Sequence, residues 1–484
     1  MFLMIQNPGV APVEGFTLLG VSTTRDCGVD GTIGQFGSGN KHAINVLLRA
    51  GLKVTVYCGK TRLEFVTRDD EVDDGITRKK VQRVVCKLGG TSSRTLDLGW
   101  VLDFGAIDWT YVSMALREFV SNAIDRTLRE ENGQFVSAIQ DGRLAVTLVD
   151  DSKVKAKDGY TRVFVEMDES VRQYVDDLSK WFLHFSDDPS QVKKCFLPKA
   201  DRNPSDRKTA VIYREGVFVR EIQDYEKESV YDYNFKAGEL PIDECRNSSD
   251  YAIRMAVSRL YRRATSEELQ PVFKALTGVK PVFEENLDPT YICPSWDTPK
   301  PEQKAAWQAA WQAVGADTVM CGPLATTTDF VQRKGYATTT VRSDALVDAA
   351  QRFGIVTDGV VLSEAEKNGH EKLPATPAAQ AAVDQVWDWL TACDLTNGRE
   401  KPPVGCFRNV MNAGRVTLGF CDDEGVFLEE AHASGVTKMV LKTTLEEVAH
   451  WVTKATDNSR DLQDFVFRLA VEALTCKDAC TVAA

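Results

Sequence analysis

Residues 31–49, GTIGQFGSGNKHAINVLLR, combine a glycine-dense loop with an apolar helical pattern directly behind it. Glycines allow a ligand to approach the backbone closely, and the free amide groups at the start of a helix attract phosphate oxygens. The spacing matches neither a Walker P-loop nor a dinucleotide-binding fingerprint. Taken alone, the segment is equally consistent with a structural turn before a helix.

Residues 116–126, LREFVSNAIDR, place Glu118, Asn122 and Asp125 at positions i, i+4 and i+7. This spacing aligns the three polar side chains along one face of a helix. A solvated helix face is the ordinary interpretation of such a stripe. The apolar residues between them, however, leave little surface elsewhere for an ordinary amphipathic helix. The stripe therefore favours a site.

Together the two segments resemble the GHKL ATPase superfamily, named for gyrase, the heat-shock chaperone, histidine kinases and MutL. REFVSNAID is similar to the helix that carries a glutamate and an asparagine in that family, and IGQFGSG is similar to the glycine loop of its large chaperone. The resemblance implies that Glu118 is the general base that activates water and that Asn122 is a magnesium ligand. Phosphoryl transfer requires little from a protein beyond positioning, a cation and a carboxylate beside the water, which agrees with this assignment.

The same resemblance implies a cradle for the phosphates. It would consist of the loop and the lysine behind it, namely Gly34, Gln35, Phe36, Gly37, Ser38, Gly39 and Lys41. Asp125, on the helical stripe of Glu118, is expected to orient the surroundings of the magnesium ion. The expected cofactors are ATP and Mg²⁺.

The order of the two motifs differs from the family. Its members carry the glutamate helix first, whereas here the glycine loop precedes Glu118. We interpret this order as a circular permutation, with the chain cut between the adenine-reading aspartate and the lid. That scheme predicts an aspartate at the end of a late strand, and LAVTLVDD at residues 144–151 fits it. Asp150 or Asp151 is therefore the candidate for contact with the adenine amino group.

Two further residues bear on the same end of the pocket. Asp103, in DFGAI, competes with Asp150 and Asp151 as the adenine-reading residue. Thr161, in GYTRVFVEM, resembles the threonine strand that closes the family pocket, although a permuted chain need not place it there.

A second block of sequence points to the same family. VIYREGVFV, followed by ELPIDECRN, resembles the middle domain of the chaperone, in which an arginine reaches the terminal phosphate. Arg246 is the matching residue, and such an arginine would stabilise charge on the transferred phosphoryl group. A surface arginine is the alternative.

The pattern of elements predicts an α+β protein whose ATP-binding domain is a two-layer α/β sandwich. Helices are expected to begin near Gly39 and Trp109. Strand-like runs occupy residues 52–57, 62–67, 81–88, 144–149 and 162–167. We expect a GHKL-like ATP-binding domain at residues 1–197, a middle or transducer-like domain at 198–298 and a mostly helical C-terminal α/β domain at 299–484.

Composition limits the broad class. The chain has 484 residues, of which 43% are apolar and 26% charged, and a net charge of −12. This charge argues against broad contact with nucleic-acid phosphates. The apolar runs are too short to span a bilayer and the chain start lacks a signal pattern, so a cytoplasmic protein is expected. Twelve cysteines without a CxxC pair predict reduced, buried thiols.

The C-terminal region contains a helix similar to the HExxH helix of zinc proteases. In LEEVAHWVT, Glu446 stands where the first histidine would be, and Glu447 and His450 remain. A third zinc ligand would have to be Asp457 or Asp461. An ordinary helix is the favoured interpretation, and an inactive, zincin-like binding module is the next.

These features predict Mg²⁺-dependent ATP binding and hydrolysis that drive a conformational change, as in chaperone and topoisomerase ATPases. One alternative is an ATP-binding regulator without turnover. The other is a metallopeptidase that uses the helix around His450. The candidate partners are ATP, a second copy of the chain in a homodimer, and a protein client bound through the C-terminal region.

Overall fold

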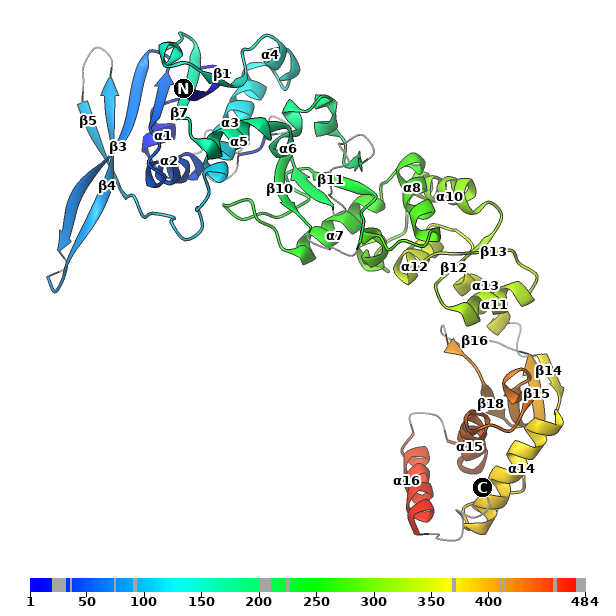
Figure 1. Ribbon diagram of the computed structural model, residues 1–484. Helices are drawn as coiled ribbons and strands as arrows, with labels where there is room; N and C mark the ends of the chain where they lie inside the picture. The colour runs from blue at the N-terminus through cyan, green and yellow to red at the C-terminus, as the bar shows by residue number, and fades with distance from the viewer. Residues whose placement is uncertain are drawn as a thin grey trace. The chain divides into compact units, whose positions relative to one another are not determined.

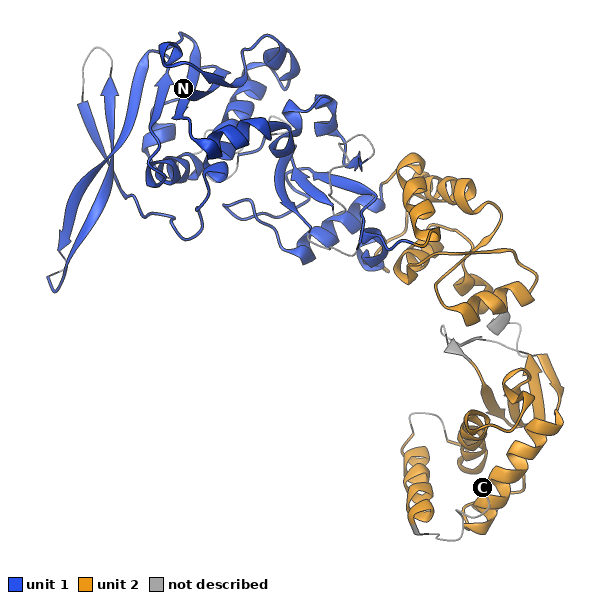
Figure 2. Cartoon of the chain, in the orientation of Figure 1, with its two compact units in different colours: residues 1–263, 280–292 blue, residues 264–279, 293–484 orange. Residues whose placement is uncertain are grey.

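The computed structural model contains two compact units with a mixed α+β architecture (Figures 1 and 2). It describes residues 1–19, 32–34, 37–73, 75–89, 94–199, 210–222, 227–367, 371–408, 411–412, 415–455 and 459–475. The first unit comprises residues 1–263 and 280–292, and the second comprises residues 264–279 and 293–484. The first unit therefore includes the segment expected to bind ATP together with most of the segment expected to form a middle domain.

A seven-stranded sheet forms the centre of the first unit. Its order is β5-β4-β3-β2-β7-β1-β6, and every neighbouring pair is antiparallel. The strands are β1 (Phe2–Pro8), β2 (Val54–Cys58), β3 (Thr61–Asp73), β4 (Arg78–Gly89), β5 (Arg94–Val101), β6 (Ala145–Val149) and β7 (Tyr160–Glu166). The five predicted strand runs are confirmed as β2, β3, β4, β6 and β7, while β1 and β5 were not anticipated.

Helices cover the sheet face toward which alternate strand residues point. Leu3 and Ile5 of β1, and Val163 and Val165 of β7, are buried in one core with the apolar residues of α2 and α3. This alternation is the period-two pattern of a strand with one buried face. The helices are α1 (Glu14–Thr17), α2 (Gly39–Arg49), α3 (Val112–Glu130), α4 (Val136–Gln140), α5 (Glu169–Asp176) and α6 (Leu178–Trp181). Helix α2 therefore begins at Gly39, as expected. Helix α3 begins at Val112, three residues after the expected start near Trp109.

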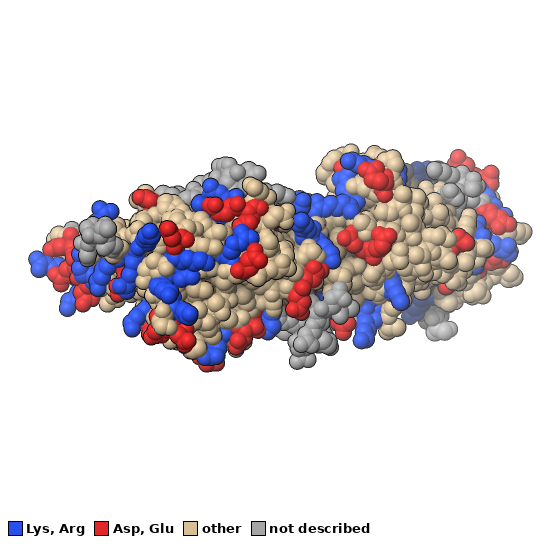
Figure 3. All heavy atoms as spheres, turned by 90° about the horizontal axis from the view of Figure 1, so that it is seen from above, with Lys and Arg blue, Asp and Glu red and all other residues tan. Residues whose placement is uncertain are grey.

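Strands β3 and β4 continue past the core as a long two-stranded arm (Figure 1). Its strands are joined by charged pairs, among them Arg83 with Asp70, and Arg68 reaches Asp97 of β5. Basic and acidic side chains are interspersed on the face shown in Figure 3. Ion pairs at such exposed positions add little stability, so the arm depends mainly on its backbone ladder.

A smaller sheet follows in the same unit, with the order β10-β9-β11-β8. The run AVIYREGVFVREI forms the hairpin β9–β10, because Glu215 and Gly216 both adopt positive φ and turn the chain. The elements are β8 (Phe196–Pro198), β9 (Val211–Arg214), β10 (Val217–Glu221), β11 (Tyr231–Phe235), α7 (Asp250–Tyr261) and α9 (Pro289–Ile292).

The second unit is mostly helical, with short strands. Its helices are α8 (Ser266–Thr277), α10 (Pro301–Gly315), α11 (Ala325–Arg333), α12 (Asp344–Arg352), α13 (Asp358–Lys367), α14 (Pro377–Ala392), α15 (Lys438–Thr453) and α16 (Arg460–Thr475). Its strands are β12 (Val319–Cys321), β13 (Thr338–Thr340), β14 (Glu371–Pro374), β15 (Val404–Arg408), β16 (Met411–Asn412), β17 (Arg415–Val416), β18 (Gly419–Asp422) and β19 (Gly425–Glu429). In the described ranges, no helix combines the length and apolar character required to cross a membrane.

Candidate functional site

The polar stripe of α3 lies inside the protein rather than on a solvated face. Glu118 is 8% exposed and Asp125 is fully buried, while Asn122 between them is half-buried. Buried carboxylates require compensating partners, because desolvation of a charge is costly. The solvated-face interpretation of this helix is therefore wrong, and the partners of each side chain identify what the stripe does.

Glu118 lies directly against the start of α2. A Cβ placed on Gly39 would press against Glu118 Oε2, so any other residue here would displace the carboxylate from this position. The sequence thus brings the glycine loop and the carboxylate helix together, although more than seventy residues separate them. A carboxylate is thereby fixed beside the first turn of a helix, the kind of position that binds phosphate.

Asp125 holds the other end of the glycine loop. Its Oδ1 accepts a hydrogen bond from the Ile33 N–H at 2.6 Å, and its Oδ2 accepts one from the Gly34 N–H at 2.8 Å. Burial raises the pKa of Asp125 to about 7, against the opposing effect of these two hydrogen bonds. Both carboxylate oxygens are occupied by the loop backbone. Asp125 therefore anchors the loop, whereas the sequence suggested that it orients a metal ion.

The loop itself turns at Gly37, whose φ of +70° favours glycine. Lys41, 1% exposed, folds back so that its Nζ donates to the Gly37 carbonyl oxygen at 2.8 Å. Burial lowers the pKa of Lys41 to about 8. Ser38 Oγ donates to Glu244 at 3.4 Å, and Gln35 and Phe36 lie outside the described residues. A buried ammonium group under a glycine turn is suited to receive an anion.

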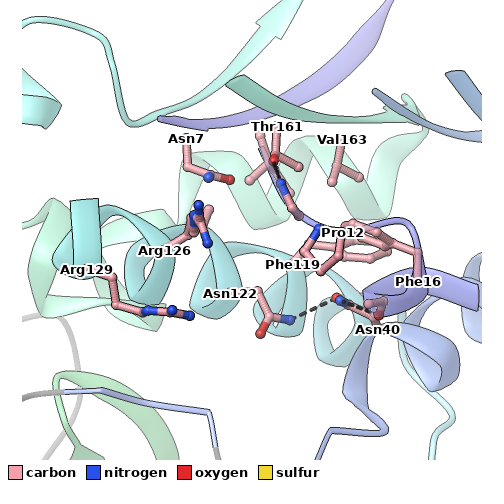
Figure 4. Close-up of a pocket in the computed structure, with 14 residues that line it drawn as sticks. Asn7, Pro12, Phe16, Asn40, Phe119, Asn122, Arg126, Arg129, Thr161 and Val163 are labelled. Carbon is pink, nitrogen blue, oxygen red and sulfur yellow. Dashed lines mark hydrogen bonds between the residues drawn. The ribbon is translucent and has the colours of Figure 1, made fainter. Parts of the chain in front are cut away.

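Asn122 points into a pocket between α3 and the sheet (Figure 4). Its Nδ2 donates to Asn40 Oδ1 at 2.8 Å, which directs its own carbonyl oxygen away from Asn40. Asn40 in turn donates to the Gly15 carbonyl oxygen at 3.3 Å. The fixed amide leaves Asn122 Oδ1 available to a cation, and amide oxygens are ligands that magnesium accepts.

The pocket itself measures about 60 Å³ and opens into a wider empty space of about 620 Å³ that includes solvent. Ile5, Phe16, Phe119 and Val163 supply apolar wall, as is usual for a small-molecule site. Its polar lining residues are Asn7, Asn40, Asn122, Arg126, Arg129 and Thr161. Glu118 lies one helical turn before Asn122, so the pocket and the glycine loop meet along α3.

Asn7 and Thr161 form the polar end of this pocket nearest the sheet (Figure 4). They are direct neighbours in the β1–β7 register, and both are nearly fully buried. The Thr161 hydroxyl donates to the Gly9 carbonyl oxygen and accepts from the Ala11 N–H, each at 2.8 Å. Asn7 Nδ2 donates to the Pro8 carbonyl oxygen at 2.8 Å, so its Oδ1 remains as an acceptor.

The expected aspartates are not brought to this pocket. Asp150 and Asp151 follow β6 at the edge of the sheet, and the exposed Asp151 pairs with the N-terminal amino group at 2.9 Å. Asp103 follows β5 and is exposed. Asn7 was missed because it is an amide at the chain start. Asn7 lies two residues after the buried Ile5, and alternate residues of a strand share one face. This alternation is the signal that could have revealed Asn7.

Arg246 is buried rather than a surface residue. Its Nε donates to Glu118 Oε1 at 2.6 Å, and the two side chains are 5% and 10% exposed. The neighbouring Arg117 of α3 donates to the Cys245 carbonyl oxygen at 2.7 Å. The loop that carries Arg246 is thus attached to α3 at two successive residues. The structure joins the two blocks of sequence that were recognised separately.

Among the described residues, the candidate ligands of the C-terminal helix α15 lie apart from one another and have other contacts. His450 Nδ1 is 2.7 Å from the Ala455 carbonyl oxygen, Glu447 packs against Gly419, and Glu446 is exposed. Asp457 lies outside the described residues, and Asp461 is in the first turn of α16. Across the ranges that the structure describes, no cluster of three or more His, Cys, Asp or Glu residues is arranged to hold a metal.

Comparison with known proteins adds no family. No protein-family model matches this sequence, and no curated protein matches it either. The functional argument therefore depends on the geometry of the first unit.

The pKa of Asp125 leads to a prediction about stability. Because its pKa is raised from 3.8 to about 7 on folding, the folded state binds a proton more tightly than the unfolded state. The free energy of unfolding should then fall as pH rises from about 4 to about 7, by at most about 1.4 kcal/mol per pH unit from this one group. In Asp125→Asn this component should be absent when urea unfolding is followed across that range.

The exposed Asp187→Asn is the control for loss of one negative charge. Parallel pH profiles for wild type and Asp125→Asn would contradict the assignment of a titrating carboxyl group to the glycine loop.

Proposed function

We propose that the first unit binds ATP with Mg²⁺ and hydrolyses it, as the resemblance to the GHKL superfamily implies. The observation that carries this proposal is the contact of the buried Glu118 with Gly39 at the start of α2. A carboxylate is held there beside a helix start, and Asn122 opens onto a pocket one turn further along α3. Base, cation ligand and anion-binding backbone are the parts that phosphoryl transfer requires.

The phosphates are assigned to the glycine loop. The start of α2 offers backbone N–H groups, and Lys41 adds a buried positive charge beneath the turn at Gly37. Burial has lowered the pKa of Lys41 to about 8, so part of its preference for the charged form has been lost on folding. A bound phosphate would restore that preference, which supports a polyanionic ligand at this position.

The adenine ring of ATP is assigned to the opposite end of the pocket. Phe16, Phe119 and Val163 can enclose a flat ring, and Asn7 Oδ1 remains as a hydrogen-bond acceptor. An acceptor selects a base that offers an amino group, as adenine does. Asn7 thereby takes the role that the sequence assigned to Asp150 or Asp151.

This assignment moves the cut of the circular permutation to another place. Along the chain the base-reading residue comes first, then the glycine loop, then the glutamate helix. That is the cyclic order of the superfamily with a different starting point, and it needs one cut, placed before Asn7. The sheet with its helices on one face supports the same fold proposal.

The reaction follows from these positions. Glu118 would take a proton from a water molecule that attacks the terminal phosphorus, and the bond to the leaving ADP oxygen would break as inorganic phosphate forms. Mg²⁺ held by Asn122 would offset charge on the phosphate oxygens. An ATP-binding regulator without turnover is the alternative, and the presence of a buried carboxylate at this position favours hydrolysis.

The role of Glu118 is tested by Glu118→Gln, which keeps its shape beside Gly39 but cannot accept the proton. We expect this variant to bind ATP and to lose turnover by about 100-fold or more, as is usual when a positioned base is removed. Phosphate release measures the rate. Glu169→Gln, an exposed change in the same unit, is the control, and normal turnover in Glu118→Gln would exclude Glu118 as the base.

The cation site is tested by Asn122→Ala, titrated with ATP in the presence and absence of Mg²⁺. Loss of one ligand should weaken the Mg²⁺-dependent part of the affinity by about tenfold and leave Mg²⁺-free binding nearly unchanged. Calorimetry separates the two contributions. Equal ATP affinity of variant and wild type with Mg²⁺ present would refute the assignment.

The adenine end of the pocket is tested by Asn7→Leu. This change retains the volume of the side chain and removes its hydrogen-bond acceptor. The dissociation constant for ATP should rise by about tenfold, because the buried amino group of the base loses its partner. The exposed Asn286→Leu is the matched control, since Asn286 does not line the pocket. If Asn7→Leu binds ATP as tightly as wild type, the base lies elsewhere.

A further inference from the structure

Arg246 holds one oxygen of Glu118 in the ligand-free protein. Oε1 accepts a hydrogen bond from Arg246 Nε at 2.6 Å, whereas Oε2 lies beside Gly39 and makes no hydrogen bond to the described residues. The oxygen that accepts this charge-assisted hydrogen bond is not available to a water molecule until Arg246 releases it.

The loop that presents Arg246 is built to hold this position. Arg246 adopts a φ of +64°, a left-handed conformation that is unfavourable for a residue with a side chain. A tight turn supports it, in which the Arg246 N–H donates to the Asp243 carbonyl oxygen at 3.0 Å. Arg117 holds the adjacent carbonyl group of Cys245. The loop can therefore stay in place while the Arg246 side chain exchanges partners.

Buried groups of both signs lie near this ion pair, among them the acidic Asp125 and Glu215. Arg117, Arg214 and Arg246 are all buried. Burial is the main cause that lowers the pKa values of Arg117 and Arg214 to about 10, and the positive charge of Arg246 is the next cause. Within the described part of the chain, the buried Arg117 Nε and Arg214 Nη1 also lack hydrogen-bond partners. Unpaired buried donors of this kind are suited to an additional anion.

We propose that the Glu118–Arg246 ion pair is a latch, which the terminal phosphate of a nucleoside triphosphate opens by taking Arg246 from Glu118. This inference rests on the proposed function, and it adds a mode of regulation to the same site. The doubly charged terminal phosphate competes with one carboxylate for the guanidinium group. A diphosphate lacks this group and leaves the latch closed. Oε1 of Glu118 thus becomes available to water when the substrate is present.

The latch predicts how affinity depends on Glu118. Opening the ion pair reduces the net free energy of ATP binding, so Glu118→Gln should bind ATP about tenfold more tightly than wild type, which corresponds to about 1.4 kcal/mol. The affinity for ADP should not change. Arg246→Met should bind ATP more weakly than wild type. Each dissociation constant is measured by calorimetry on the full chain with Mg²⁺ at one pH and salt concentration.

The double variant separates the latch from simple charge repulsion. Removing the charge of Glu118 would favour a phosphate even without a latch, but that effect would persist when Arg246 is absent. The latch predicts that Glu118→Gln gives no gain in ATP affinity in the Arg246→Met background, as in a double-mutant cycle between contacting residues. An equal gain in both backgrounds, an equal gain for ADP, or no gain in the single variant would overturn it.

Stability of the variants is controlled within the same set. Arg246→Met leaves a buried carboxylate unpaired, which destabilises a protein more than loss of the whole pair does. If that single variant does not fold, Arg246→Gln replaces it in the cycle, because it removes the charge while an amide can still donate a hydrogen bond to Glu118. A wild-type chain that binds neither nucleotide would refute the proposed function itself. A wild type that binds both, with no gain in Glu118→Gln, would refute the latch alone.

Discussion

Helix α3 carries ionisable side chains into the interior of the first unit. Other segments of that unit supply the partners that offset the cost of burying these charges. Each buried charge is met by a group from a distant segment, because an unpaired charge there would be costly. Glu118 pairs with Arg246 of the second block, and Asp125 accepts two backbone N–H groups from the glycine loop. Arg117 donates to the backbone beside Arg246. The helix thus fixes both the loop and the neighbouring sheet segment relative to itself.

The opposite face of the same helix explains why this arrangement is stable. Leu116, Phe119 and Val120 of α3 pack with the inward residues of the central sheet in a single core. The apolar face sets the depth and rotation of the helix, and burial of such side chains stabilises the fold by about 1.5–3 kcal/mol each. The polar stripe can then be held at fixed positions. Catalytic groups require this kind of support, since a small displacement of a base or a ligand reduces its effect strongly.

The register of the sheet places the other end of the site. Because side chains alternate along a strand, Asn7 and Thr161 share the face of Ile5 and Val163 and thus look toward α3. The pocket therefore lies between a rigid sheet and a rigid helix. One end of the pocket comes from β1 and β7, and the other end comes from α2 and α3. A molecule in the pocket would therefore contact the start of α2, helix α3 and the strands at the same time.

The sequence by itself determined the local parts of this protein. The spacing of Glu118, Asn122 and Asp125 fixed their helical stripe, and the glycine loop before α2 followed from composition, because both depend on neighbouring residues alone. The strands with alternating apolar residues were predictable for the same reason.

Tertiary structure decided the partners. The contact of Glu118 with Gly39, the burial of Arg246 against Glu118 and the loop-anchoring role of Asp125 join residues far apart in the chain, and no local pattern specifies such pairs. The presence of Asn7 at the pocket, where the sequence predicted Asp150 or Asp151, has the same origin. Which residue faces the pocket depends on strand order, and strand order is set by packing across the whole sheet.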